Sequence, residues 1–168
     1  MKFKICKDIE ECKSLWNSFS PNQRLFDLWD YRICFFDERS HEPHFIVGHG
    51  KDNNWTPPGG AIEKGETYEQ ASIREIKEES NMKVLYQECI GYQDIETSGE
   101  NRVQRQFRMF CIVEPYGNFE FDPDGDILEI KLIDPKDYKK YIQWGEIGDH
   151  LIKRALEMKD KFYCKQRI

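Results

Sequence analysis

The segment 60–82 constrains this chain most, because it joins a glycine-rich turn to a helical pattern that carries three closely spaced glutamates. Glu75, Glu78 and Glu79 stand at positions i, i+3 and i+4, which lie on one face of a helix about one turn apart. Like charges at this spacing repel one another. A divalent cation reverses that cost, and carboxylates on a rigid helix suit Mg²⁺ or Mn²⁺. The spacing indicates either a metal site or a solvated acidic face, which is the commoner case.

The rest of the segment is consistent with a helix that packs on a sheet. Apolar and small residues recur at helical spacing on the other face: Ser72, Ile73, Ile76 and Ser80. Upstream, Pro57-Pro58-Gly59-Gly60 predicts a rigid turn followed by two residues that are able to take positive φ. Such a loop brings backbone close to the helix and to a substrate, although a glycine pair after proline is more often only a turn.

From Gly60 to Met82 the segment reads G-x5-E-x7-R-E-U-x-E-E-x-x-U, where U is an apolar residue. A pattern with this many fixed positions is far more specific than a short motif. It resembles the Nudix box, G-x5-E-x7-R-E-U-x-E-E-x-G-U, and Pro58-Gly59-Gly60 is similar to the family's lead-in. Asn81 departs from it, standing where the family has glycine. That position ends the helix in left-handed backbone, for which asparagine is the best substitute, and the metal ligands are intact.

The order of the expected elements agrees with the resemblance over residues 30–158. Apart from the helix over 67–80, we expect strands over 31–36, 44–47, 84–95, 103–113 and 127–133, a loop over 51–60, a short helix after Pro135 and a longer helix over 147–159. Neighbouring strands joined directly, with helices between groups of them, favour a mixed sheet covered on both sides. The predicted fold is therefore α/β, a Nudix-type α/β/α sandwich with a mixed β-sheet.

The first 29 residues are not explained by the box, and we expect them to form an N-terminal helical extension packed on a Nudix domain at 30–168. Asp8 and Glu11 fit an acidic relative of the capping box and predict a helix from Asp8. Ser20-Pro21 predicts a short turn through Asp27. The extension holds too many aromatic residues to leave in water, so the domain, the substrate pocket or a homodimer should cover them: Trp16, Phe19, Phe26 and Trp29.

The resemblance also implies an activity and the residues that carry it. Nudix enzymes hydrolyse a nucleoside diphosphate linked to another group, with Mg²⁺ or Mn²⁺. The implied metal ligands are Glu75, Glu78 and Glu79, and Glu75 or a carboxylate from a later loop would deprotonate the attacking water. Arg74 keeps its proton and would hold Glu75 or Glu66 in place. Glu66 would then have a structural role or act as an outer ligand of the metal, and we count it among the catalytic residues with Arg74 and Glu75.

Further candidates bind the substrate or complete the site. Gly59 and Gly60 would let the backbone reach the metal or the substrate. The later-loop carboxylate is sought in the acidic segment 122–129, at Asp126 or Glu129, although an acidic turn beside a strand edge explains the same residues. Arg102, Arg105 and Arg108 lie three apart on an expected strand, so Arg105 faces away from the other two. We assign Arg108 to a phosphate of the substrate, against the alternative of exposed strand charges.

Composition narrows the function classes. The chain has 168 residues, 39% of them hydrophobic, which suits one domain with a sizeable core. The longest apolar run, 109–113, is far short of the ~20 residues of a membrane-spanning helix, and residues 1–8 lack the apolar part of a secretory signal. A net charge of −6 argues against sequence-blind nucleic-acid binding. Six cysteines without a C-x-x-C pair indicate buried thiols in a reducing cytoplasm.

These observations together predict a cytoplasmic pyrophosphohydrolase acting on a small nucleotide diphosphate, without a nucleic-acid duplex or membrane partner. Nucleoside triphosphates are favoured by default, because residues 97–100 lack the proline or tyrosine associated with some ADP-ribose and dinucleoside-polyphosphate subfamilies. The alternative is a nucleotide-sensing Nudix-like module that does not hydrolyse, but its signature is loss of the acidic ligands, which are present here. Diphosphate isomerisation would require catalytic Cys and metal-binding His residues that we do not identify.

Overall fold

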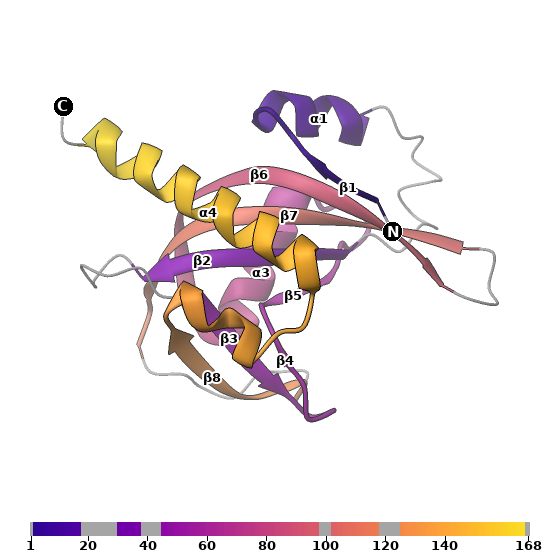
Figure 1. Ribbon diagram of the computed structural model, residues 1–168. Helices are drawn as coiled ribbons and strands as arrows, with labels where there is room; N and C mark the ends of the chain where they lie inside the picture. Colours follow the sequence, from indigo (N-terminus) through magenta and orange to yellow (C-terminus); the bar gives the residue numbers. More distant parts are fainter. Residues whose placement is uncertain (1, 18–29, 38–44, 98–101, 118–124, 167–168) are drawn as a thin grey trace.

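The computed structural model describes residues 2–17, 30–37, 45–97, 102–117 and 125–166, which form two β-sheets with helices on both sides (Figure 1). The strands of the larger sheet are β1 (Lys2–Ile5), β6 (Met82–Thr97), β7 (Arg102–Pro115), β2 (Asp30–Asp37) and β5 (Gly59–Ala61), in that order. The smaller sheet has the order β4 (Trp55–Thr56), β3 (Phe45–Gly50) and β8 (Ile127–Ile133). The helices are α1 (Ile9–Asn17), α3 (Tyr68–Ser80), the 3₁₀ helix η1 (Pro135–Lys140) and α4 (Gly145–Gln166).

The larger sheet is mixed, as predicted. β2 runs parallel to β7, while the β1–β6, β6–β7 and β2–β5 pairs are antiparallel. Successive residues of β7 point to opposite faces of the sheet. Phe107 and Met109 pack with Ile76 of α3, whereas Phe110 packs with Leu151 of α4. The strand is therefore buried on both faces, which explains its almost continuous apolar run at 109–113.

Helix α3 begins and ends where its sequence predicts. Thr67 is the N-cap, and its side chain accepts a hydrogen bond from the Gln70 N–H while the Gln70 side chain accepts one from the Thr67 N–H. Asn81 is the C-cap, with φ 52° and ψ 44°, and its N–H donates to the Lys77 carbonyl at 2.9 Å. The left-handed conformation expected at Asn81 is thus confirmed. Asn81 ends the helix of the box in the conformation for which the family has glycine.

The N-terminal extension differs from the purely helical one expected. Residues Lys2–Ile5 form β1, which adds to the edge of the larger sheet beside β6. Helix α1 then begins at Ile9, one residue after the predicted start at Asp8, and the Glu11 N–H donates to Asp8 Oδ1 at 2.9 Å. The Glu11 carboxylate accepts from the Lys7 N–H, so the cap closes one residue earlier than in a standard capping box. The expected turn at 20–27 and the side chains of Trp16, Phe19, Phe26 and Trp29 lie outside the described residues.

Other boundaries shift by a few residues. The expected loop at 51–60 contains the short strands β4 and β5, and the helix after Pro135 is a 3₁₀ helix capped by Asp134. Helix α4 extends beyond the expected 147–159 at both ends. In the described part of the chain, none of the helices is long and apolar enough to cross a membrane.

The prediction of reduced thiols is wrong for one pair of cysteines, because Cys6 and Cys12 form a disulfide. Sequence spacing cannot reveal this pairing, since it depends on β1 and α1 folding back on each other. Cys89 and Cys111 are buried thiols as expected, and burial raises the pKa of each to about 12. Cys164 is an exposed thiol, and the side chain of Cys34 lies outside the described residues.

Candidate active site

Arg74 of α3 is the centre of the candidate site. Its Nε and Nη2 donate to the two carboxylate oxygens of Glu66, at 2.8 and 3.0 Å. Its Nη1 donates to Glu75 Oε1 at 2.7 Å and more weakly to Glu78 Oε2 at 3.4 Å. Nη2 also donates to the carbonyl of Ala61 at 3.1 Å. Both carboxylates expected as partners of Arg74, Glu75 and Glu66, therefore bind it, and the one guanidinium links α3 to the loop before it.

The charges of this network reinforce one another. The hydrogen bond from Arg74 lowers the pKa of Glu66, with a smaller contribution from the Glu63 N–H, which donates at 3.0 Å. The same bond to Glu66 raises the pKa of Arg74. Both groups are therefore ionised at neutral pH, and the Glu66 carboxylate holds the guanidinium by a bidentate, charge-assisted contact. The arginine is fixed in position before any ligand arrives.

Gly59 and Gly60 lie on β5 without positive φ, unlike the turn expected there, and they contact the glutamates of α3 directly. The Gly59 N–H donates to Glu79 Oε2 at 3.2 Å. The α-carbon of Gly60 lies so close to the Glu75 carboxylate that a β-carbon there would overlap it. Glu75 is itself 9% exposed, so its side chain has little space to withdraw. The pairing of β5 with β2 fixes these glycines beside the helix, and glycine is required at position 60 to admit the carboxylate.

The three glutamates of α3 line one face but do not converge on a point. In the described part of the chain, Glu75, Glu78 and Glu79 do not form a group of three ligands whose atoms all lie within 4.8 Å of one another. Arg74 Nη1 bridges the Glu75 and Glu78 carboxylates, whereas the Glu79 carboxylate accepts from the Gly59 N–H. Mg²⁺ is usually bound by one or two carboxylates, several waters and substrate phosphates. A row of hard oxygen donors therefore fits such a cation, and full convergence is not required.

The two candidates for a later-loop carboxylate lie just before β8 and on it. Asp126 forms an ion pair with Lys51 Nζ at 2.5 Å, with both side chains exposed. Glu129 lies on β8, where it pairs with His49 of β3, and is also exposed. These contacts do not test a role in the site, so the assignment of a later-loop carboxylate to Asp126 or Glu129 stays a prediction.

Arg105 and Arg108 lie on opposite faces of β7, as their spacing predicts. Arg105 makes a bidentate contact with Asp94 at 2.6 and 2.8 Å. Arg108 is 2% exposed, and its Nη2 donates to Gln93 Oε1 at 2.6 Å and to Gln106 Oε1 at 2.8 Å. The alternative of exposed strand charges therefore does not hold for Arg108. The side chain of Arg102 lies outside the described residues.

Three residues around Arg108 were not found by sequence reasoning. Gln93 and Gln106 orient the guanidinium, and the Trp144 ring lies 4.6 Å from it. Gln106 could have been found, because it stands two residues before Arg108 on the same face of a strand. Gln93 comes from the neighbouring strand, where two register shifts in the β6–β7 pairing hide the alignment. The position that Arg108 occupies on β7 is adjacent to Arg32 on β2, which pairs with Gly59 on β5.

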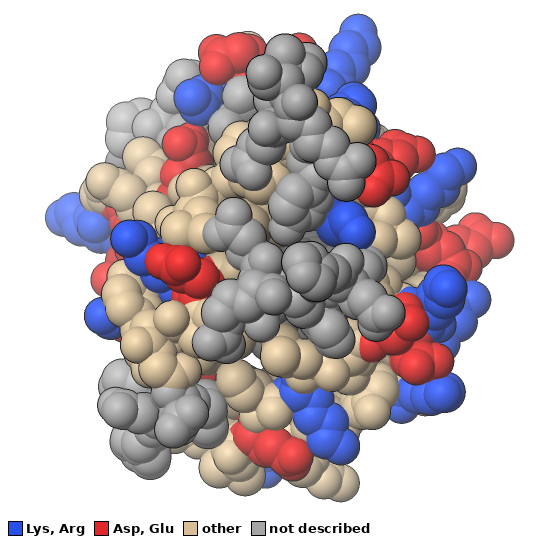
Figure 2. Space-filling model, turned by 90° about the vertical axis from the view of Figure 1, so that its left-hand side faces the viewer, with Lys and Arg blue, Asp and Glu red and all other residues tan. Residues whose placement is uncertain are grey.

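The surface charge outside the site is mixed. On the face shown in Figure 2, the acidic and basic side chains of the described residues are interspersed, without separation into one broad area of either sign. The acidic character of the candidate site arises from the glutamates around Arg74, which a net charge of −6 for the whole chain does not locate.

Comparison with known proteins agrees with this geometry. Residues 31–155 match the family model described as NUDIX domain. No match was found among curated proteins.

The fold is similar to that of a C. elegans Ap4A hydrolase in a binary complex, with a TM-score of 0.60 and 17% identity over 80% of this chain and 98% of that chain. It is also similar to the NUDIX domain of Shewanella oneidensis NrtR complexed with ADP ribose, with a TM-score of 0.63 and 14% identity over 87% and 97%. A third similar structure is the E. coli dihydroneopterin triphosphate pyrophosphohydrolase, with a TM-score of 0.55 and 13% identity over 77% and 95%.

Proposed function

This chain belongs to the Nudix family of diphosphate-bond hydrolases, and we propose that it cleaves a nucleotide-type diphosphate with the help of Mg²⁺ or Mn²⁺. The observation that carries the proposal is the pairing of Arg74 with both Glu66 and Glu75. This pairing fixes the nearly buried Glu75 carboxylate beside the glycines of β5. The glutamates of α3 then form a row of oxygen donors along one face of the helix. That arrangement suits the binding of a cation together with a diphosphate.

The roles of the residues follow from their positions. A divalent cation, when bound, would withdraw charge from the phosphate oxygens and lower the pKa of the attacking water. Glu75, Glu78 and Glu79 would hold it, with Glu75 also orienting the water and accepting its proton. Arg74 keeps its own proton and acts by positioning Glu75. Glu66 acts indirectly, by holding the Arg74 guanidinium that positions Glu75.

Gly59 and Gly60 of β5 would bring the backbone beside the diphosphate. Gly59 already donates its N–H to Glu79, and Gly60 gives the space that Glu75 occupies. The two glycines thus help to fix the Glu75 and Glu79 carboxylates, and they also supply a surface without side chains. A substrate is able to approach such a surface closely.

Arg108 is our candidate for contact with a substrate phosphate. Its amide partners, Gln93 and Gln106, orient the guanidinium without neutralising it. Strands are spaced about 4.8 Å apart, so the Arg108 backbone lies about 10 Å from Gly59, two strands away. The guanidinium is buried against Trp144, so direct contact with a phosphate requires that ring to move aside.

A substrate panel tests the proposed function. We expect release of phosphate or pyrophosphate from at least one of a nucleoside triphosphate, ADP-ribose and a dinucleoside polyphosphate, with nucleoside triphosphates the first choice. Activity should require Mg²⁺ or Mn²⁺ and disappear with EDTA, because the acidic face otherwise repels the anionic substrate. Turnover at the full rate in metal-free buffer would contradict the proposal.

The same panel separates hydrolysis from mere sensing. If the protein is a non-catalytic nucleotide-binding module, calorimetry will show one of these nucleotides binding while its diphosphate stays intact. If it is an enzyme, the bound nucleotide will be consumed and binding will be measurable only with a non-hydrolysable analogue in the presence of the metal. The two results exclude each other for any one nucleotide.

Replacing Arg108 tests its role in substrate binding. We expect Arg108→Gln to raise KM by about 10-fold or more and to change kcat less, because a positive charge near a phosphate contributes to binding before the reaction. Arg105→Gln is the matched control, since Arg105 lies on the same strand but faces the other way and pairs with Asp94. Equal effects of the two substitutions on KM would show that Arg108 only supports the fold.

A further inference from the structure

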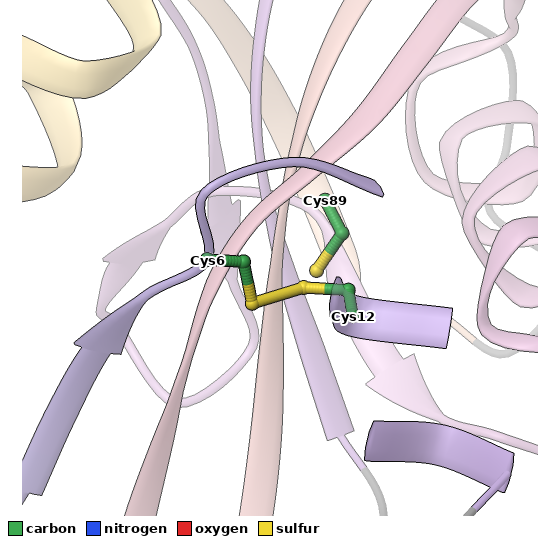
Figure 3. Close-up of side chains that lie close together, drawn as sticks. All are labelled: Cys6, Cys12 and Cys89. Carbon is green, nitrogen blue, oxygen red and sulfur yellow. A yellow bond between two sulfur atoms is a disulfide. The ribbon is translucent and has the colours of Figure 1, made fainter. Parts of the chain in front are cut away.

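Three cysteine sulfurs converge in the core. Cys6 follows β1, Cys12 lies in the first turn of α1, and Cys89 lies on β6. Their sulfur atoms all lie within 4.8 Å of one another, and the three residues are 0–1% exposed. Figure 3 shows the Cys89 side chain with its sulfur directed at the disulfide between Cys6 and Cys12. Segments far apart in the sequence thus bring three potential ligands to one place.

The spacing of these sulfurs fits a thiolate metal site. Zn²⁺ binds thiolate at about 2.3 Å in a tetrahedral arrangement, which places two ligand sulfurs about 3.8 Å apart. Once the Cys6–Cys12 bond is opened, its two sulfurs need to move apart only by a change of side-chain torsion angle. Cys89 already lies within the 4.8 Å limit of both. The backbone therefore has no need to rearrange for all three sulfurs to reach one cation.

The backbone around the sulfurs is held firmly. The Cys6 N–H donates to the Ile90 carbonyl at 3.1 Å, which ties the residue after β1 to the residue after Cys89. The Cys12 N–H donates to the Asp8 carbonyl as the first bond of α1. Cys12 thus lies near the positive end of the helix dipole, which stabilises a thiolate. The ligands are fixed relative to one another by the same contacts that attach the extension to the domain.

Cys89 is a buried thiol. Burial raises the pKa of Cys89 to about 12, so at neutral pH its proton stays in place until a cation takes its position. Thiolate sulfur is a soft ligand that selects Zn²⁺ or Cu(I), whereas the glutamates of α3 are hard oxygen donors that suit Mg²⁺ or Mn²⁺. The two places in this protein would therefore bind different cations.

We propose that Cys6, Cys12 and Cys89 form a binding site for one thiophilic cation of the zinc class in the reduced protein, and that the Cys6–Cys12 disulfide is the oxidised, metal-free form of this site. Reduction by a dithiol breaks the bond between the two sulfurs, transfers two electrons to them and leaves the dithiol as its own disulfide. Zn²⁺ then replaces the protons of three thiols, so that three protons are released and the metal keeps its oxidation state. The site would fasten β1 and α1 to β6.

The test uses Co²⁺ as a spectroscopic substitute for Zn²⁺ on the full chain under anaerobic conditions. The dithiol-reduced protein should show thiolate-to-cobalt charge-transfer absorption that saturates at one Co²⁺ per chain and is displaced by Zn²⁺. Carboxylates give no such band, so metal at α3 does not interfere. In the oxidised protein the band should fall below about a tenth of the reduced value, because two of the three ligands are bonded to each other.

Peptide mapping defines the two forms. Trypsin cleaves after Lys4, Lys7 and Lys13, which separates Cys6 from Cys12. Without reductant, residues 5–7 and 8–13 should therefore appear as one disulfide-linked pair of peptides, and after reduction as two. This measurement shows which form is present in each absorption experiment.

Cys89→Ser should remove the band from the reduced protein. Cys111→Ser is the matched control, because Cys111 is also fully buried, belongs to the same core cluster as Cys89 and lies on the strand beside it. Absence of the band in the reduced parent chain, its persistence in Cys89→Ser, or its loss from a folded Cys111→Ser would each overturn the proposal. If Cys89→Ser does not fold, the comparison of the reduced and oxidised parent chains decides.

Discussion

Glu78→Gln and Glu79→Gln are each expected to lower kcat by about 100-fold or more, which corresponds to about 2.7 kcal/mol of activation free energy. Glutamine keeps the shape of the side chain and an oxygen acceptor but removes the negative charge. The Gly59 N–H and the Arg74 guanidinium therefore still find an acceptor at positions 79 and 78. The loss of activity is then due to charge, measured as kcat for the best substrate of the panel at saturating Mg²⁺.

Stability should move in the opposite direction from activity in these variants. Removing one of several like charges on the α3 face relieves repulsion, so Tm without metal should hold or rise. Glu69→Gln is the control, since Glu69 lies in the first turn of the same helix. It should leave kcat near the parent value. Retention of most activity by both Glu78→Gln and Glu79→Gln would show that the acidic face is only a solvated surface.

The ends of helix α3 and the contacts between residues close in sequence were the features that the sequence predicted best. Thr67 and Gln70 close a capping box, and Asn81 adopts left-handed backbone, so both ends of α3 follow from residues within a few positions of them. The contact of Arg74 with Glu66 was expected from the resemblance to the Nudix box, in which the two residues stand eight positions apart. Short-range features of this kind need no knowledge of the remaining chain.

Features that depend on strand pairing were missed. Residues Lys2–Ile5 alternate polar and apolar side chains, which is a strand signal, but four residues become a strand only by pairing with β6, some 90 positions away. The partners of Arg108 depend on the register of β6 against β7, which bulges shift twice. The Cys6–Cys12 bond likewise depends on β1 and α1 meeting over β6. Sequence patterns predicted the strands of the sheet better than the contacts between them.

Arg74→Lys is expected to lower kcat by about 10- to 100-fold and to leave KM nearly unchanged. Lysine keeps the positive charge but loses the fork that holds both oxygens of Glu66 while a third nitrogen holds Glu75. A loss in orientation of this kind typically has an effect of that size. Arg105→Lys is the matched control, because Arg105 has a similar exposed fraction and makes the same bidentate contact, with Asp94. It should keep its kcat.

The stability of Arg74→Lys should also depend on pH in a way that identifies the bond lost. At pH 7 we expect a decrease of about 1–2 kcal/mol in the free energy of unfolding, from losing charge-assisted hydrogen bonds. The Arg74 bond lowers the pKa of Glu66, so it stabilises the fold above the ordinary glutamate pKa of 4.5 and this contribution is lost as the pH falls through the lowered value. The difference between parent and variant, measured by urea unfolding, should therefore shrink below about pH 4.5. A difference that stays constant from pH 7 to pH 3 would show that Arg74 stabilises α3 by packing rather than through Glu66, and its proposed role in positioning Glu75 would lose its support.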